Sequence, residues 1–335
     1  MSVTIKDVAT AAGVSTATVS HVFNETRFVS EGTKRRVQQM AARLGYVPNV
    51  NAAGLRGRRT KRIGLLVPAV SSFFSVDILD AVEPALLARG YQLMFGCTHE
   101  DIVREREQIE IFNYQRIDGL LMFPAPGDHS YLDQMPRQYP IVFLDREATG
   151  CRRDVVLGEN YQATYDVISQ MIREGHRCIG IVNGTEGVSC LQERIDGYKQ
   201  ALADHGIPFE PAFLQNGNSS FQGGYDATDR LIHDGRVTAI VALSPAMVVG
   251  CFRCLIKHSI RIPEQIALLS FGNSAWAGVT NPPLSVMRHP LLEIGQVAAQ
   301  KLLERLDACE GRAYTPPETY ETIRLPIELV RRCTY

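Results

Sequence analysis

The chain of 335 residues is too long for one ordinary hydrophobic core, so we expect two or three domains. A hydrophobic content of 45% and a charged content of 21% are typical of a globular protein. Residues 1–10 lack the layout of a signal peptide, and no apolar run is long enough to span a bilayer. These features predict a cytoplasmic protein with no membrane partner.

Charge is distributed unevenly along the chain. Residues 1–62 hold eleven basic and three acidic side chains, whereas the remaining residues hold 24 basic and 33 acidic ones. The net charge of −1 therefore conceals a basic head and an acidic body. Phosphate backbones attract the first and repel the second, so the pattern predicts a DNA-binding module joined to a separate control domain.

The basic head carries the pattern of a helix-turn-helix. Thr4 and Asp7 form a capping-box pair that predicts a helix over about 5–12. Gly13 is expected to end it, and a second helix is expected over about 16–24. A third helix should run from Ser30 to the Gly45 cap. The side chains expected to face the interior are Val8, Val14, Val19, Val22, Phe23, Val37, Met40, Ala41 and Leu44.

Beyond residue 62, short apolar runs alternate with helical stretches. Two successive βα series predict two doubly wound lobes with a cleft between them. The first series has strands near 63–67, 91–96, 118–125 and 140–145, with helices near 74–89 and 101–115. The second has strands near 178–182, 212–216, 238–243 and 266–271, with helices near 160–174, 192–205, 223–234 and 246–258.

The run IKDVATAAGVSTATVSHVFNETRFVS, followed by LGYVPNVNAAGLR, resembles the start of the lactose/galactose repressor (LacI/GalR) family. The resemblance extends over essentially the whole chain. It implies an α/β protein with a small all-α head and a two-lobed periplasmic-binding-protein-like effector domain built on two doubly wound parallel sheets. The implied domains are a DNA-binding head at 1–47, a hinge helix and linker at 48–60, and an effector-binding and dimerisation domain at 61–335. Its N-lobe would comprise about 61–158 and part of 290–325, and its C-lobe about 160–288 and the C-terminal segment.

In this family the second helix of the head enters the major groove of operator DNA. The matching outward positions are Thr16, Ala17 and His21, and Ala17 departs from the polar residue usual there. The alternative for His21 is an ordinary solvated histidine. The positions better placed for phosphates are Thr18, Ser20 and Asn24.

Residues 48–58 resemble the family's hinge helix. This segment is short and contains two glycines, so alone it should be mostly unfolded. In the family, two such helices fold together in the minor groove and drive a leucine between base pairs. Leu55 matches that leucine, and Arg56 begins an arginine-rich run suited to phosphates. The alternative is an exposed leucine in a solvated linker.

The resemblance also implies where a small effector would bind. Phe73 and Phe74 follow the first strand, where the family places an aromatic ring against the effector. Arg194 matches the effector-binding arginine, with an ion pair to a neighbouring glutamate as the alternative. Arg146 closes another strand, where a ligand contact and a structural role remain equally open. After the strand at 266–271, Asn273 and Trp276 are candidates, although Trp276 could only fill the core.

Two departures from the family pattern affect this cleft. Family members usually carry Asn-Asp and Asp-Asp where this chain has Ser244–Pro245 and Gly272–Asn273. Aspartates of such pairs accept hydrogen bonds from sugar hydroxyls. A cleft that keeps the arginine but lacks both carboxylates repels anions less. This favours a sugar acid over a neutral sugar as effector.

Nucleotide-binding and catalytic motifs are missing, so we expect neither an enzyme nor a cofactor. His176, between a helix end and a strand, is expected to cap or lie at the surface. Cys251 and Cys254 form the one CxxC among eight cysteines, with no second pair or nearby histidine to complete a zinc site. We therefore expect buried thiols and no metal.

These observations predict a nucleoid-associated repressor that binds a pseudo-palindromic operator as a homodimer and responds to a small molecule. Two rivals remain: a sugar-binding protein or enzyme with an accessory basic head, and an architectural minor-groove binder. Whether the effector releases the operator or acts as co-repressor stays open, as do its identity and the regulated genes. The ending LVRRCTY lacks a leucine heptad, which favours a dimer over a tetramer.

Replacement of the wedge leucine tests the hinge assignment. Leu55→Ala should weaken specific operator binding by about 1–3 kcal/mol, the usual effect of one mismatched base pair, and leave effector binding intact. Fluorescence anisotropy on an operator duplex measures the first and calorimetry the second. Unchanged operator affinity would refute the wedge.

Overall fold

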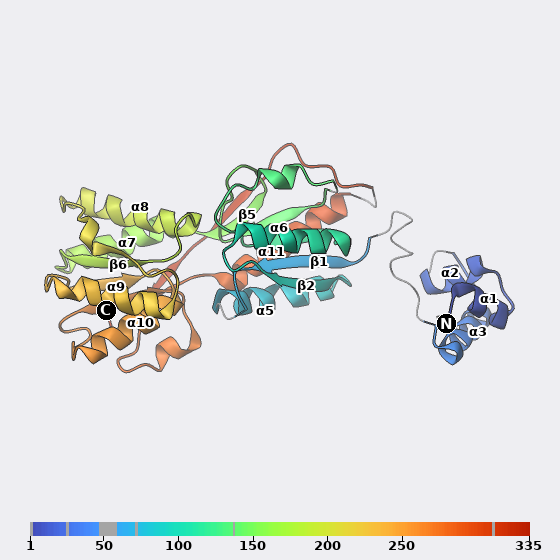
Figure 1. The fold of residues 1–335 in the computed structure, drawn as a ribbon, viewed down its shortest axis with the longest axis horizontal. Helices are drawn as coiled ribbons and strands as arrows, with labels where there is room; N and C mark the ends of the chain where they lie inside the picture. The colour runs from blue at the N-terminus through green and yellow to red at the C-terminus, as the bar shows by residue number, and fades with distance from the viewer. Residues whose placement is uncertain (1–2, 25–26, 47–58, 71–72, 137, 310–311) are drawn as a thin grey trace. The chain divides into compact units, whose positions relative to one another are not determined.

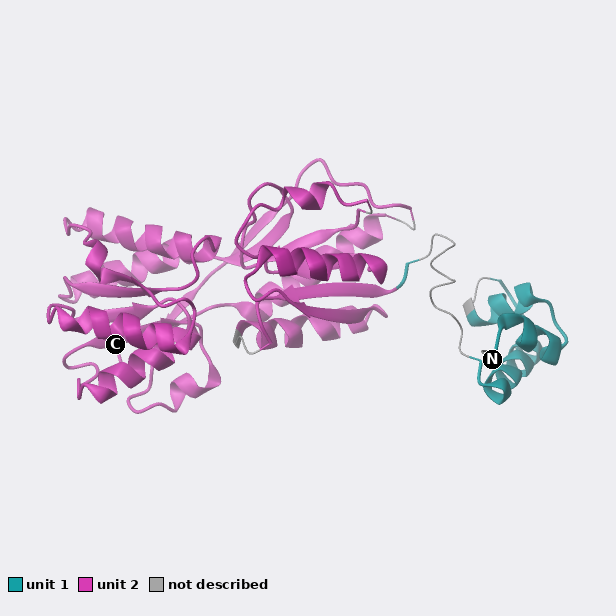
Figure 2. Cartoon of the chain, viewed as in Figure 1, with its two compact units in different colours: residues 1–60 teal, residues 61–335 magenta. Residues whose placement is uncertain are grey.

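The structure, a computed structural model, describes residues 3–24, 27–46, 59–70, 73–136, 138–309 and 312–335. It divides into two compact units, residues 1–60 and residues 61–335 (Figure 2). The hinge positions Leu55 and Arg56 lie outside the described residues. Within the described part of the chain, no helix combines the length and the apolar character needed to cross a membrane.

The described residues of the smaller unit form the helices α1 (Ile5–Ala12), α2 (Thr16–Asn24) and α3 (Glu31–Leu44). The predicted capping box at the start of α1 is present, and Gly13 ends this helix with a φ of 63°. The Ser15 hydroxyl accepts the Thr18 backbone N–H at 3.1 Å, as a start of α2 requires. The buried core residues are Val8, Ala9, Ala12, Val19, Val22, Val37 and Ala41.

One predicted core position of this unit is wrong. Leu44, in the last turn of α3, is 37% exposed. Tyr46 packs against the core cluster there, and its ring lies 5.9 Å from that of Phe23. The chain beyond the Gly45 cap, rather than the last helical turn, therefore covers this end of the core.

The larger unit contains two six-stranded sheets, each covered by helices on both faces (Figure 1). The first sheet is fully parallel, in the order β11-β5-β4-β3-β1-β2. Its central strands are buried along their whole length, as strands with helices on both faces must be. Its strands are β1 (Arg62–Val67), β2 (Gln92–Cys97), β3 (Gly119–Met122), β4 (Ile141–Leu144), β5 (Asp154–Gly158) and β11 (Thr322–Leu325), and its helices are α5 (Phe73–Leu87), α6 (Ile102–Tyr114) and α11 (Leu291–Ala308).

The second sheet has the order β12-β10-β9-β8-β6-β7 and is parallel except for its β12–β10 pair. Its strands are β6 (Ile179–Asn183), β7 (Leu214–Asn216), β8 (Ala239–Ala242), β9 (Ala267–Phe271), β10 (Ser285–Arg288) and β12 (Glu328–Val330), and its helices are α7 (Asn160–Arg173), α8 (Ser189–Asp204), α9 (Phe221–His233) and α10 (Pro245–Lys257). The two predicted doubly wound lobes are thus confirmed. Strand β5 was not predicted, because its three apolar residues stand between charged neighbours.

The chain passes between the lobes after β5, after β10 and after β11 (Figure 1). Each of these strands leaves its own parallel sheet at its carboxyl end. The carboxyl ends of both sheets therefore face the opposite lobe, which is where ligands bind in open α/β folds.

Helices α9 and α10 of the second lobe approach each other through a pair of glycines. A Cβ on Gly250 would overlap the carbonyl oxygen of Phe221, and a Cβ on Gly224 would overlap that of Met247. The two helix backbones are therefore in contact at this crossing, and this contact keeps the distance between α9 and α10 short along their interface.

Gly250→Ala should destabilise the larger unit by about 1–3 kcal/mol, because backbone atoms cannot move aside as a flexible side chain can. Urea denaturation followed by circular dichroism measures the change. Gly278→Ala is the matched control, since a Cβ there meets nothing within 4 Å. Equal stability of the two variants would contradict the close approach.

Candidate functional site

The guanidinium of Arg194, on α8, lies at the carboxyl ends of the second sheet's strands and is only 2% exposed. Its Nε donates to Asn160 Oδ1 at 2.8 Å, and its Nη1 donates to the Leu243 carbonyl oxygen at 2.8 Å. The central carbon of the guanidinium, Cζ, lies 4.1 Å from the centroid of the Phe271 ring. The side chain therefore ties α8 to the start of α7 and to the ends of β8 and β9. The alternative ion pair with neighbouring Glu193 is not formed, because that carboxylate binds Arg324 at 2.8 Å.

Asp145 follows β4 in the first lobe and is 4% exposed, with a φ of 59°. His289, on the connection from β10 to α11, places its Nε2 2.5 Å from Asp145 Oδ1. Burial acts to raise the pKa of Asp145, but His289, Arg194 and Arg146 together hold this pKa below its usual range. The carboxylate is therefore ionised at neutral pH and offsets the buried positive charge.

Arg146 is 9% exposed and forms a two-pronged ion pair with Glu100, at 2.6 and 2.8 Å. Its Nη1 also approaches the Pro124 carbonyl oxygen at 3.4 Å. Most of its charge is thus already compensated within the first lobe. Its Nε is buried without a hydrogen-bond partner, so one donor remains for a ligand.

Several other buried polar atoms at this edge also lack a partner among the described residues. They lie at the end of β6, after β8, after β9 and on the connection between the lobes, and they are Asn183 Oδ1, Ser244 Oγ, Ser274 Oγ and His289 Nδ1. Buried polar groups are normally hydrogen-bonded, and unpaired ones need an explanation. Their gathering where the two lobes meet indicates a site whose partners arrive with a ligand.

A cavity of about 240 Å³ lies at this edge, and Ser274 and His289 are the two of these residues that line it. The ring of Phe74 lies edge-on to His289, with centroids 6.1 Å apart, and Asn273 accepts from Arg332 Nη2 at 2.9 Å. The structure thus brings Phe74 and Asn273 together with His289; the side chain of Phe73 lies outside the described part. The cavity is lined by Phe74, Asp77, Pro245, Gly272, Asn273, Ser274, Arg288, His289 and residues 290–293.

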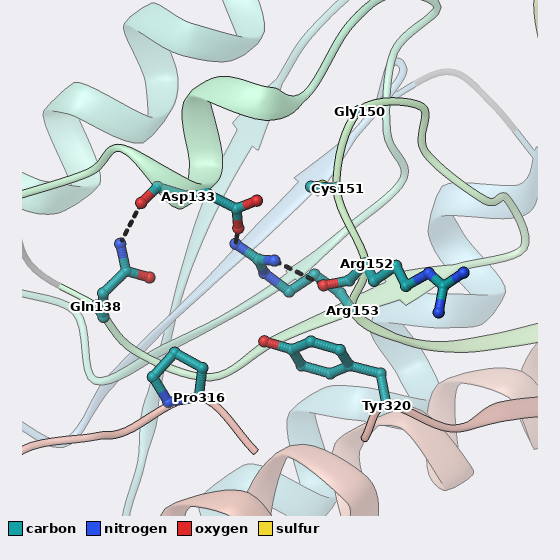
Figure 3. A pocket seen from close by; sticks show the side chains of 8 residues that line it. All are labelled: Asp133, Gln138, Gly150, Cys151, Arg152, Arg153, Pro316 and Tyr320. Carbon is teal, nitrogen blue, oxygen red and sulfur yellow. Dashed lines mark hydrogen bonds and ion pairs between the residues drawn. The ribbon is translucent and has the colours of Figure 1, made fainter. Parts of the chain in front are cut away.

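Trp276 takes the core position that the sequence left open as the alternative to a ligand contact. It packs against the core of the second lobe and lines a separate apolar hollow of about 460 Å³ with Val249, Phe252 and Ile256 of α10. It does not join the polar groups at the cleft. A third hollow, of about 760 Å³, lies before the start of β5, where Arg153 pairs with Asp133 at 2.7 Å (Figure 3). Strands begin rather than end there, so it is not part of the cleft either.

On the head, α2 presents Thr16 and Ala17 to solvent, while Ser20 and His21 are half-buried. The Thr18 hydroxyl is engaged with the Ser15 hydroxyl at 2.9 Å. The side chain of Asn24 lies outside the described residues. Basic side chains on the exposed surface of this unit are Lys6, Arg27, Arg35, Arg36 and Arg43.

Three residues of the cleft were not predicted from the sequence. They are Asn160, His289 and Glu100, which pairs with Arg146. No motif marks them, since each is joined to its partner by the fold rather than by spacing. His289 and Asp145 are 144 residues apart.

Family models match both units of this chain. The model "Bacterial regulatory proteins, lacI family" matches residues 4–49, and the model "Periplasmic binding protein-like domain" matches residues 168–335. The ribose operon repressor of Haemophilus influenzae is 31% identical over 99% of this chain and 98% of its own length. The HTH-type transcriptional repressor PurR of Photobacterium profundum is 31% identical over 90% of this chain and 92% of its own length.

Solved structures agree with this fold. A transcriptional regulator CelR–cellobiose complex is 25% identical and covers 99% of this chain, with all of that chain matched and a TM-score of 0.73. The Lac repressor dimer bound to operator and an anti-inducer is 23% identical, covers 100% of this chain and 99% of its own, and has a TM-score of 0.85.

The ionised state of Asp145 predicts how stability changes with pH. Because its folded pKa is lowered, its contribution is present above the unfolded value of about 3.9 and is lost as the pH falls through the folded value. Asp145→Asn should therefore be less stable at pH 7 and lose less stability below about pH 4. Thermal denaturation from pH 3 to 7 measures this, with exposed Asp80→Asn as control. Parallel pH profiles for Asp145→Asn and the wild type would contradict the assignment.

Proposed function

Because the chain belongs to the lacI family of bacterial regulatory proteins, we propose that it is a transcriptional repressor controlled by a small carbohydrate-class effector. The head binds operator DNA, and the two-lobed body binds the effector. The observation that carries the effector site is the set of unpartnered buried polar atoms where the lobes meet.

Exposed residues of α2 support the DNA-reading surface. Thr16 and Ala17 face solvent near the start of the helix, and the surrounding surface is basic. We propose that they contact base edges together with His21, while Ser20 and Thr18 lie toward phosphates. The hinge residues Leu55 and Arg56 add the minor-groove contact of the same proposal, as does Asn24 toward phosphate.

The mixed polarity of the cleft supports an effector with several hydroxyl groups. Asn183 Oδ1 can only accept a hydrogen bond, Arg146 Nε can only donate, and the serine hydroxyls can do either. A sugar offers donors and acceptors at every hydroxyl. The loops after β8 and β9 bring no aspartate, and we therefore propose a sugar acid, with a neutral sugar as the alternative.

An apolar face on the second lobe supports a homodimer. Val249 and Ile256 of α10 are 37% and 62% exposed. Val279, three residues after Trp276, is 83% exposed. Exposed aliphatic side chains around an apolar hollow are typical of a surface that a second copy covers. A two-fold dimer presents two heads to a two-fold operator.

Control would act through the orientation of the lobes. A ligand in the cleft bonds groups of both lobes and of their connection, so it favours one relative orientation over others. That orientation sets the spacing of the paired hinges and so the operator affinity. We propose regulation rather than catalysis because the relatives of both units are repressors.

Selection from a randomised duplex library tests the DNA part. The full chain should enrich a two-fold symmetric site, and binding to it should fall steeply with salt while exceeding binding to shuffled duplex by at least about 1,000-fold. Equal affinity for both duplexes would point to an architectural DNA binder, and no DNA binding to the sugar-binding rival.

Calorimetry with sugar acids and neutral sugars tests the effector part. The bound ligand should weaken operator affinity, and operator DNA should weaken ligand affinity by the same factor. Arg194→Lys keeps the charge but loses the planar fork and should reduce the response. Asn273→Ala, at a more exposed position, serves if the buried variant is unstable. Binding of neutral sugars alone would overturn the acidic effector, and a ligand without effect on operator binding would overturn the control.

A further inference from the structure

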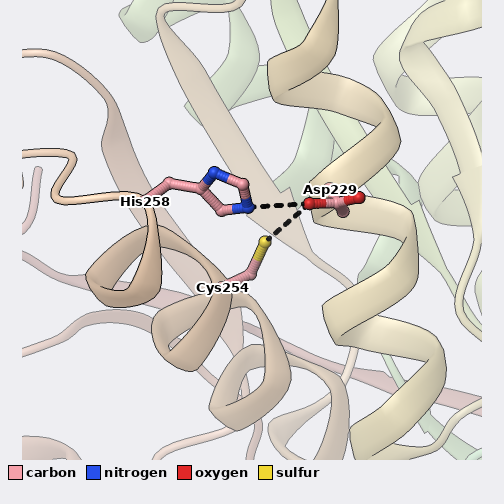
Figure 4. A group of neighbouring side chains, drawn as sticks. All are labelled: Asp229, Cys254 and His258. Atoms are coloured by element: carbon pink, nitrogen blue, oxygen red, sulfur yellow. Dashed lines mark hydrogen bonds and ion pairs between the residues drawn. The ribbon is translucent and has the colours of Figure 1, made fainter.

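Three side chains with metal-binding atoms meet between α9 and α10, away from the cleft (Figure 4). Cys254 lies in the last turn of α10, and His258, four residues further on, is the residue that caps this helix. Asp229 of α9 faces them. The glycine crossing described above sets this short separation, because it brings the two helix backbones into contact.

The distances fit one ion. Asp229 Oδ1 lies 2.8 Å from His258 Nε2 and 3.9 Å from Cys254 Sγ, and all three ligand atoms lie within 4.8 Å of one another. Zinc bonds of about 2.0–2.3 Å at tetrahedral angles place ligand atoms roughly 3.3–3.6 Å apart. Small rotations of the side chains reach that arrangement. The Asp229 and His258 side chains are 52% and 43% exposed, so both can rotate and an ion can enter from solvent.

We propose that Asp229, Cys254 and His258 bind a divalent transition-metal ion of the zinc class. One thiolate, one imidazole and one carboxylate are the donors that zinc accepts, and the exposed side leaves a fourth position for water. Binding releases the thiol proton of Cys254 to the buffer, and the negative charges of the cysteinate and the Asp229 carboxylate together balance the two positive charges of the ion. The sequence analysis set aside the CxxC of Cys251 and Cys254 for want of a nearby histidine, and the partner is His258, one helical turn beyond.

The alternative is a hydrogen-bonded trio, in which the Cys254 thiol donates to Asp229 Oδ1 at 3.9 Å and His258 Nε2 lies 2.8 Å from the same oxygen. Such a trio gives no charge-transfer band with cobalt(II), so the spectrum separates it from a metal site.

The site would fasten α9 to α10. Its ligands lie on the face of α10 toward α9, whereas Val249, Phe252 and Ile256 lie on the face that lines the apolar hollow. Metal binding and self-association are therefore separable. Since α10 begins at Pro245 in the cleft, a bound ion would stabilise the helix pair behind the effector site.

Cobalt(II) is the probe, because a thiolate in a tetrahedral site gives it a sulfur-to-metal charge-transfer band and intense visible bands. We expect one ion per full-length chain, displacement by zinc, and a higher melting temperature with zinc that a chelator reverses. Cys254→Ser should abolish the charge-transfer band. His258→Gln and Asp229→Asn should weaken binding at least about 100-fold, since loss of even an indirect metal contact costs 10–100-fold.

Cys333→Ser is the matched control, because Cys333 is an exposed free cysteine outside the cluster. It should bind cobalt as the wild type does. The exposed variants His258→Gln and Asp229→Asn keep the test decisive if Cys254→Ser does not fold. Absence of a charge-transfer band in the wild-type chain, its persistence in Cys254→Ser, or unchanged cobalt affinity in His258→Gln and Asp229→Asn would overturn the proposal. Operator binding at fixed metal concentration is a separate readout, so failure here leaves the proposed function untouched.

Discussion

The burial of the Arg194 guanidinium is the constraint on which the surrounding structure depends. A charge removed from water is tolerated only when hydrogen bonds and an opposite charge compensate it. Asn160 and the Leu243 carbonyl supply the hydrogen bonds, and ionised Asp145, whose bonded partner is His289, adds an electrostatic attraction without a direct contact. The first two belong to the second lobe and the third to the first lobe. The attraction between Arg194 and Asp145 therefore acts from one lobe to the other, and a ligand that changes it acts on both lobes.

His289 extends that coupling to the connection between the lobes. Its Nε2 faces Asp145 while its Nδ1 is buried without a partner, and the residue lines the cavity. A ligand that bonds Nδ1 therefore acts directly on a segment that must bend when the lobes reorient. Arg146 differs, because Glu100 already compensates it and only its Nε remains. The cleft offers a ligand individual hydrogen-bond donors and acceptors rather than uncompensated charges. No one ionic group of the cleft therefore decides which effector binds.

The sequence allowed prediction of whatever depends on local pattern. Apolar runs and helical periodicity located most strands and helices, and the head's caps were readable because they involve neighbours such as Thr4 and Asp7. Long-range pairs escaped, as Asp145 with His289 and Cys254 with Asp229 show. For Trp276 the choice between a ligand contact and the core stayed open, because nearness in sequence to a cleft loop does not say which way a side chain points; the residue packs against the core of the second lobe. The short strand β5 was hidden by its charged flanks, since burial there comes from neighbouring strands.

Pro245 and Gly272, which stand at the two expected departures from the family pattern, lie against each other. Gly272 has a φ of 91°, and a Cβ there would lie 2.5 Å from Cγ of Pro245. An aspartate at 272 would therefore meet the proline ring as well as backbone strain, while the proline itself replaces the other aspartate. The proline ring and Gly272 therefore fit each other, so the residue at either position limits what the other can be.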